Sequence, residues 1–183
     1  VIGLGSSATF ATVARSEEVS ALKEVFQVMA ERGATLFDTA PGYGVSEQVA
    51  GQIVNELGIA GKMFWATKLN AAGRGGGTTD PAAARAQVEQ SFERLKRPKI
   101  DLIQVHNMSD VPTQLGVLKE YKKEGRVKYI GVTTTFEPQY PGLIEVMKTF
   151  QEVPAGVEGR NITFLVDNEE PVMAGQVIAE VEA

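Results

Sequence analysis

The segment TLFDTAPGYGVSEQVAG, residues 35–51, contains in one short stretch the elements of a βα unit. Its apolar start predicts a strand that ends at the acidic residue Asp38. A proline and two glycines then predict a turn, and Ser46 begins an amphipathic helical pattern. A tyrosine, Tyr43, lies inside this turn, where an aromatic side chain is seldom needed. The segment therefore predicts a strand, a loop with a functional side chain, and a helix.

The same alternation continues on both sides of this segment. The predicted strands are centred on residues 1–4, 36–37, 63–67, 102–105 and 129–132, and the predicted helices begin near residues 16, 46, 80, 113 and 143. Asp80 followed by proline is typical of a helix start, because the side chain caps the helix and proline suits its first turn. Five such alternations predict a parallel sheet with helical crossovers.

The alternating pattern ends near residue 150. We expect residues 1–150 to form the βα units and residues 151–183 to be a diverged or truncated C-terminal segment of the same domain. Within that segment, residues 161–166 could form a sixth strand, and AGQVIAEVEA, residues 174–183, could be a strand or a frayed helix.

The composition narrows the class of protein. The chain has 183 residues, 43% of them hydrophobic and 22% charged, which is typical of a soluble globular domain. A net charge of -5 argues against nucleic acid as a partner, and no apolar run reaches the roughly 18 residues of a membrane span. The chain has no cysteine, which is consistent with the cytoplasm. Since it starts at Val1 rather than Met, a removed leader and export stay open.

Polar side chains follow successive predicted strands. Asp38 follows the second strand, Lys68 the third and His106 the fourth, while Tyr43 lies in the loop five residues after Asp38. Because the carboxyl ends of strands in a parallel α/β barrel share one face, we expect these four side chains to meet in one pocket.

The four residue types together suit the protonation of a carbonyl oxygen. A tyrosine hydroxyl is a weak acid, and a nearby ammonium is expected to lower its pKa while a carboxylate orients the ammonium. A neutral imidazole can hydrogen-bond the substrate oxygen. The hydride that accompanies such a protonation must come from a cofactor.

Four segments of the chain, in order, resemble the aldo-keto reductase superfamily. They are LFDTAPGYGVSE, WATKLN, SFERLKRPKIDLIQVHN and EGRVKYIGVT. The resemblance covers about the first four-fifths of the chain and implies a (β/α)8 TIM-barrel type of α/β fold, with NADPH (NADP) as cofactor and an aldehyde or ketone as substrate. It implies catalytic roles for Asp38, Tyr43, Lys68 and His106. It also implies cofactor contacts at Gly5, Ser6, Ser7, Asp38, Asn107, Thr133 and Thr134.

Two departures from the family pattern qualify this resemblance. Where many members have Ser-Asn after the fifth strand, this chain has Thr133-Thr134, and the basic loop for the adenosine phosphates has no counterpart. A full barrel needs about 250 residues, so we expect an incomplete barrel with about five or six βα units. An open sheet edge would then allow self-association.

Alternatives remain for the function and for single motifs. Each of the four polar residues alone would be an ordinary turn, core or surface residue; only their joint placement indicates a site. GRGGGTT, residues 73–79, lacks the end of a phosphate-binding loop and is predicted to be a lid, and no metal-ligand spacing is present. The leading hypothesis is an NADPH-dependent carbonyl reductase; the alternatives are a non-catalytic binding or regulatory subunit and a truncated product.

Overall fold

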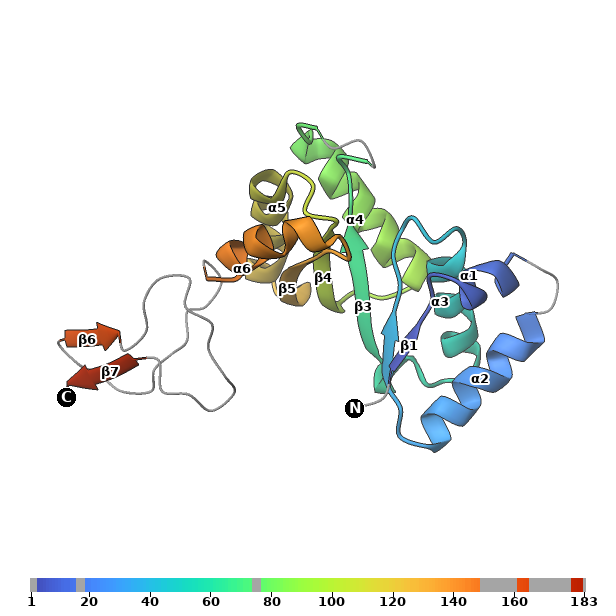
Figure 1. Ribbon diagram of the computed structural model, residues 1–183. Helices are drawn as coiled ribbons and strands as arrows, with labels where there is room; N and C mark the ends of the chain where they lie inside the picture. The colour runs from blue at the N-terminus through green and yellow to red at the C-terminus, as the bar shows by residue number, and fades with distance from the viewer. Residues whose placement is uncertain (1–2, 16–18, 74–76, 149–160, 165–178, 183) are drawn as a thin grey trace. The chain divides into compact units, whose positions relative to one another are not determined.

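The computed structural model describes residues 3–15, 19–73, 77–148, 161–164 and 179–182. Within these residues, five strands form one parallel sheet in the order β1-β2-β3-β4-β5, which is also their order along the chain (Figure 1). The strands are β1 (Gly3–Gly5), β2 (Leu36–Asp38), β3 (Phe64–Leu69), β4 (Ile100–His106) and β5 (Val127–Thr133). The predicted parallel α/β fold is therefore confirmed, with β1 and β5 at the two edges of this sheet.

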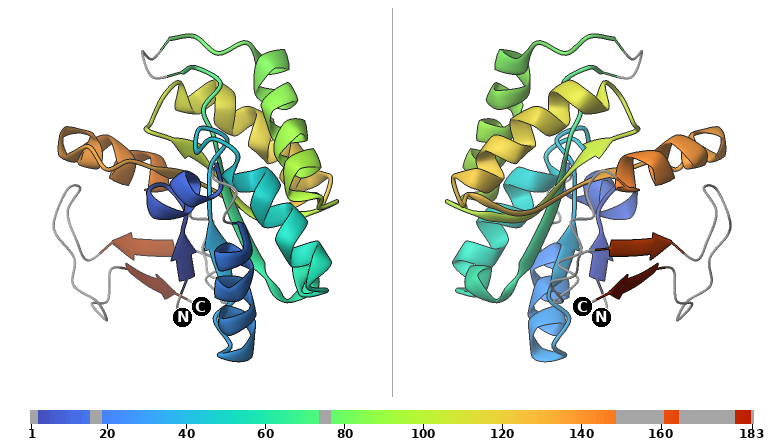
Figure 2. Two further views of the ribbon diagram at one scale, coloured as in Figure 1. Left: turned by 90° about the vertical axis from the view of Figure 1, so that its right-hand side faces the viewer. Right: turned by 90° about the vertical axis from the view of Figure 1, so that its left-hand side faces the viewer.

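Helices α1 to α5 lie in the connections between successive strands of the sheet, and α6 follows β5. They are α1 (Thr9–Val13), α2 (Val19–Glu31), α3 (Ser46–Glu56), α4 (Pro81–Leu95), α5 (Val111–Lys123) and α6 (Tyr140–Lys148), with short 3-10 turns η1 (Ala60–Lys62) and η2 (Glu137–Gln139). Helices α2 to α5 lie on the same side of the sheet in both views of Figure 2. The short helix α1 was not predicted, because one turn of helix is too short to show a hydrophobic period.

Local sequence signals explain where α4 begins. Asp80 Oδ1 accepts a hydrogen bond from the Ala82 backbone N–H at 2.9 Å, and Pro81 occupies the first turn. At the other end, Lys96 adopts a left-handed backbone conformation with φ 53°. The cap and the proline confirm the predicted start of this helix.

An aromatic cluster forms part of the core between the sheet and its helices. Phe37 and Trp65 are register partners on adjacent strands, and their rings meet edge to face with centroids 5.8 Å apart. Phe10 of α1 and Phe26 of α2 pack on Phe37 at 5.1 and 5.2 Å. Edge-to-face and tilted rings at these separations are favourable, and all four side chains are buried.

Side chains alternate between the two faces of the sheet, so the residues between the helix-covered ones face the opposite side. In the parallel register, Asp38 pairs with Ala66, Lys68 with Gln104, and His106 with Thr133. The alternation therefore places Asp38 and Lys68 on one face of adjacent strands, near their carboxyl ends.

Contacts divide the chain into two units, residues 1–147 and 148–183. In the second unit, β6 (Asn161–Phe164) pairs antiparallel with β7 (Ala179–Glu182). The predicted strand at residues 161–166 is confirmed over residues 161–164, where it pairs antiparallel with β7; residues 165 and 166 lie outside the described residues.

Candidate active site

The four predicted catalytic residues come together at the carboxyl ends of the strands. Asp38 is the last residue of β2, Lys68 the next to last of β3 and His106 the last of β4, while Tyr43 lies in the loop before α3. Lys68 Nζ lies 5.4 Å from the centroid of the Tyr43 ring. The Tyr43 and His106 rings meet edge to face, with centroids 6.0 Å apart and planes at 81°. One cluster thus contains a carboxylate, an ammonium, a phenol and an imidazole.

Lys68 is almost completely buried, at 7% exposure. Its Nζ donates hydrogen bonds to Asp38 Oδ1 at 2.7 Å and to the Thr39 backbone oxygen at 3.0 Å. A buried ammonium needs such acceptors, because leaving water without them costs several kcal/mol. The two bonds hold the ammonium in one place within the cluster.

The pKa of the Tyr43 hydroxyl is raised above its ordinary value. Burial is the larger cause, and the negative charge of Asp38 adds to it. The net lowering of this pKa expected from Lys68 is therefore not found; the net shift is upward. The Lys68 ammonium is paired with Asp38, so burial and the carboxylate dominate at the phenol.

The pKa of His106 is lowered. Burial of the imidazole is the main cause, the Lys68 charge lowers the pKa further, and Asp38 partly opposes both. His106 is therefore neutral at pH 7 and can donate a hydrogen bond from one nitrogen while the other accepts one.

The predicted cofactor turn at the end of β1 lies directly beside Asp38. Gly5 is the register partner of Asp38, and the Ser6 backbone N–H donates to the Asp38 backbone oxygen at 3.0 Å. The Ser6 side-chain oxygen is buried and has no hydrogen-bond partner among the described residues, whereas Ser7 is exposed. A buried hydroxyl without a partner is unusual and indicates a group that a ligand could satisfy.

The other predicted cofactor residues differ in exposure and in the hydrogen bonds that their side chains already make. Asn107 follows His106 in a left-handed conformation with φ 60° and is exposed. Thr133 is the register partner of His106. The Thr134 hydroxyl is already used, because it donates to Gln139 Oε1 at 2.6 Å and accepts from the Phe136 N–H at 3.1 Å. Thr133 is thus the better placed of the two threonines.

Sequence reasoning missed a buried carboxylate next to the cluster. Glu47, in the first turn of α3, is 1% exposed and accepts a hydrogen bond from the Thr67 hydroxyl at 2.7 Å. The signal was its position in the helix: it shares the buried face with Ala50 and Val54, three and seven residues further on. A charged residue on an apolar helix face indicates a buried polar contact.

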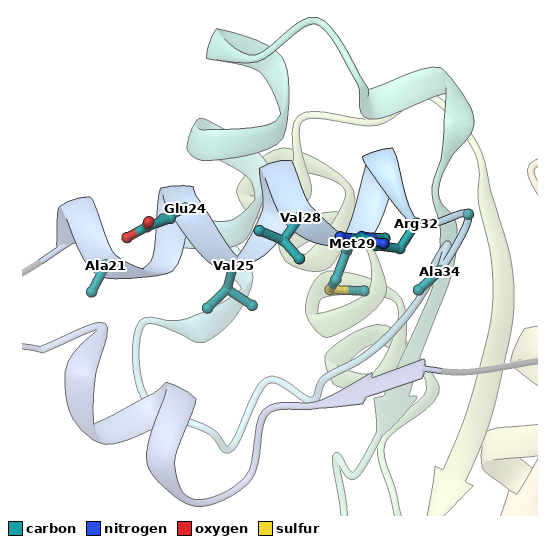
Figure 3. A pocket seen from close by; sticks show the side chains of 8 residues that line it. Ala21, Glu24, Val25, Val28, Met29, Arg32 and Ala34 are labelled. Atoms are coloured by element: carbon teal, nitrogen blue, oxygen red, sulfur yellow. The ribbon is translucent and has the colours of Figure 1, made fainter.

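A groove along α2 is separate from this cluster. Its lining includes Val25, Val28 and Met29, with Glu24 and Arg32 as the charged members (Figure 3). Val25 and Val28 are 40% and 50% exposed. None of its lining residues is a predicted site residue, so the groove adds nothing to the site.

The described part of the chain has neither a metal-binding cluster nor a helix that could span a membrane. It contains no group of three or more His, Cys, Asp or Glu side chains arranged to hold a metal ion. None of its helices combines the length and hydrophobicity of a membrane span.

Comparison with known proteins identifies the family. The five-stranded parallel α/β sheet carries this cluster at the carboxyl ends of its strands. The Aldo/keto reductase family model matches residues 1–157. The chain belongs to this family. It is similar to the aldo-keto reductase YhdN of Bacillus subtilis strain 168, with 31% identity over 160 residues, covering 83% of this chain and 46% of that protein.

Solved structures agree with this assignment. An aldo/keto reductase from Brucella melitensis matches with a TM-score of 0.59 and 27% identity, over 80% of this chain and 54% of that chain. An aldo/keto reductase from Klebsiella pneumoniae, in complex with NADP and acetate, matches with a TM-score of 0.57 and 25% identity, over 74% of this chain and 46% of that chain. The chain spans about half the length of these relatives.

Proposed function

We propose that the protein reduces an aldehyde or ketone to an alcohol, using NADPH as the hydride donor. The observation that carries the proposal is the ion pair between buried Lys68 and partly exposed Asp38, at 2.7 Å, beside the edge-to-face contact of Tyr43 and His106. This arrangement can hold a carbonyl oxygen and deliver a proton to it.

The residues at the carboxyl ends of β1 and β5 fit a nicotinamide cofactor. The buried and unpartnered Ser6 hydroxyl is a polar group that the described residues leave unsatisfied, and Thr133 and Asn107 lie next to His106 along and across the strands. These groups would bond the polar atoms of the cofactor, together with Asp38 at the neighbouring strand end. When bound, the cofactor supplies the hydride that forms the new C–H bond.

Tyr43 is the proposed general acid. Its raised pKa keeps the phenol protonated at neutral pH, so a proton is available when negative charge develops on the substrate oxygen. His106, neutral at the same pH, is the proposed hydrogen-bond donor that orients the carbonyl toward the phenol. Both groups act on the oxygen, which suits a reaction whose charge develops there.

Asp38 and Lys68 act on the proton donor. The Lys68 ammonium, held by two acceptors, lies 5.4 Å from the Tyr43 ring and would stabilise the phenolate that remains after proton transfer. Asp38 holds the ammonium in position. The pair therefore supports the charge that the reaction leaves on Tyr43.

The test is carbonyl reduction by the full chain, followed as oxidation of NADPH with a panel of aliphatic and aromatic aldehydes. Tyr43→Phe should abolish turnover and leave the affinity for NADPH nearly unchanged, since the hydroxyl is needed only when charge develops on the oxygen. Tyr140→Phe, an exposed tyrosine in α6, is the matched control. Turnover of Tyr43→Phe within a few-fold of the parent would contradict the assignment.

A further inference from the structure

Glu47 is a buried charged residue to which the proposed reaction gives no task. It lies one residue after Ser46 in α3 and is 1% exposed. Its Oε1 accepts the Thr67 hydroxyl at 2.7 Å, and its Oε2 pairs with Arg94 of α4 at 3.4 Å. Because a buried carboxylate is costly without partners, these bonds constrain the elements that they join.

The hydrogen bond between Glu47 and Thr67 restrains strand β3 next to Lys68. Thr67 is the residue before Lys68 on β3, and it is completely buried. Successive side chains of a strand point to opposite faces, so Thr67 faces the helices while Lys68 faces the cluster. A hydrogen bond that restrains Thr67 therefore also restrains the backbone of the next residue, Lys68.

The start of α3, which carries Glu47, is hydrogen-bonded to the loop that carries Tyr43. The Ser46 backbone N–H donates to the Tyr43 backbone oxygen at 3.2 Å, and the Tyr43 N–H donates to the Ala40 oxygen at 3.0 Å. The loop that carries Tyr43 is thus bonded to the first residue of α3. A shift of this helix end would move the phenol.

A second buried contact joins the same helix end to the ion pair. The hydroxyls of Thr39 and Ser46 are hydrogen-bonded at 3.1 Å, and the Thr39 backbone oxygen accepts a bond from Lys68 Nζ at 3.0 Å. The N-terminus of α3 is therefore linked to the carboxyl ends of both β2 and β3.

We propose that the hydrogen bond between Glu47 and Thr67 is a positioning element that sets where Tyr43 lies relative to Lys68 and His106. Neither residue reaches the reacting atoms. They act by holding the start of α3, and with it the Tyr43 loop, against β3. The kinetic consequence rests on the proposed function, whereas the geometric consequence does not.

The test uses two substitutions of the partner hydroxyl. Thr67→Val removes the hydroxyl and keeps the branched shape, while Thr67→Ser keeps the hydroxyl and removes a methyl group. His106 is the only histidine of the chain, so it gives a single set of imidazole proton resonances, and the Tyr43 ring meets it edge to face. We expect Thr67→Val to move these resonances and Thr67→Ser to keep them close to those of the parent.

A kinetic measurement accompanies the spectrum. We expect kcat of Thr67→Val to fall about tenfold or more with KM within about twofold, because small misplacements of a proton donor act on the chemical step. Glu89→Gln is the matched control, since Glu89 also holds an arginine, Arg126, at 2.8 Å, but away from the cluster. It should alter the free energy of unfolding and leave the His106 resonances in place.

Three outcomes would overturn the proposal. They are parent-like His106 resonances in Thr67→Val, equal displacements in the Val and Ser variants, and an equal displacement in Glu89→Gln. The first shows that the hydrogen bond positions nothing, the second that packing does so, and the third that the change is not local. If the parent chain reduces no carbonyl compound, the proposed function fails, and the resonances still decide the positioning role.

Discussion

Lys68 Nζ donates to Asp38 Oδ1 at 2.7 Å, although the two residues are 30 positions apart in the chain. The parallel register explains the contact: Asp38 pairs with Ala66, two residues before Lys68, so both side chains emerge on the same face of neighbouring strands. The ion pair is thus a direct product of the strand register, and a one-residue slip would separate its members.

Replacement of Lys68 by methionine should raise the pKa of Tyr43 further. Asp38 already raises this pKa, and without the ammonium its charge would be unpaired. We therefore expect the high-pH limb of the pH dependence of kcat to move to higher pH, together with a lower kcat. Lys68→Arg retains the positive charge and serves as the control. An unchanged high-pH limb, or one that moves to lower pH, would show that Asp38 and Lys68 do not set the pKa of the proton donor in this way.

The same substitution should lower stability only modestly. The Asp38 side chain is 36% exposed, so water can solvate its charge once Lys68 is gone. We expect a loss of about 1 kcal/mol, well below the cost of exposing a fully buried charge pair. Urea unfolding of Lys68→Met measures it, and a loss of about 4 kcal/mol would show that solvent does not reach Asp38.

His106 should make stability depend on pH. Because its pKa is lower in the folded state, the unfolded chain binds a proton first as the pH falls through the ordinary value. The free energy of unfolding should therefore decrease between the unfolded pKa and the folded pKa, and this loss should be absent in His106→Gln. Urea unfolding from about pH 8 to about pH 5 measures the difference between the two proteins. A difference that stays constant over this range would contradict the lowered pKa.

The sequence predicted those features that depend on local signals and periodicity. The start of α4 at Asp80 and Pro81 is one case, and the placement of polar residues at successive strand ends is another. The direction of the Tyr43 pKa shift was not predictable, because it depends on distances to burying atoms and to Asp38 that only the folded chain defines.

Other features escaped for related physical reasons. The bond between Glu47 and Thr67 joins residues 20 positions apart, and no local pattern encodes such a pair. The antiparallel pairing of β6 was missed because a short apolar run predicts a strand without naming its partner. Sequence patterns thus identify elements and candidate side chains, whereas the contacts between them decide charge states and partners.

Asp80 should contribute to the stability of α4 as its N-cap. Its Oδ1 accepts the Ala82 N–H at 2.9 Å, a donor that the helix itself cannot satisfy. Asp80→Ala should therefore lower the free energy of unfolding by about 1 kcal/mol, while Asp80→Asn should stay close to the parent. Urea unfolding compares the three proteins, and an Ala variant as stable as the parent would show that the cap contributes nothing.

Gly51 lies inside α3 and Gly116 inside α5, and we expect Gly51 to be the less replaceable of the two. A Cβ atom at Gly51 would lie 2.4 Å from the Arg94 backbone oxygen and 2.8 Å from the Leu95 carbonyl carbon. These are backbone atoms of α4, which cannot turn aside as a side chain would, so α3 and α4 must separate. Overpacking of this kind costs about 1 to 3 kcal/mol, and it outweighs the roughly 1 kcal/mol by which alanine favours a helix over glycine.

Gly116→Ala in α5 is the matched control, because its Cβ would meet no atom within 4 Å and only the helix preference remains. Urea unfolding should therefore show Gly51→Ala below the parent and Gly116→Ala above it. A Gly51→Ala protein as stable as Gly116→Ala would mean that the two helices do not touch through their backbones at this position.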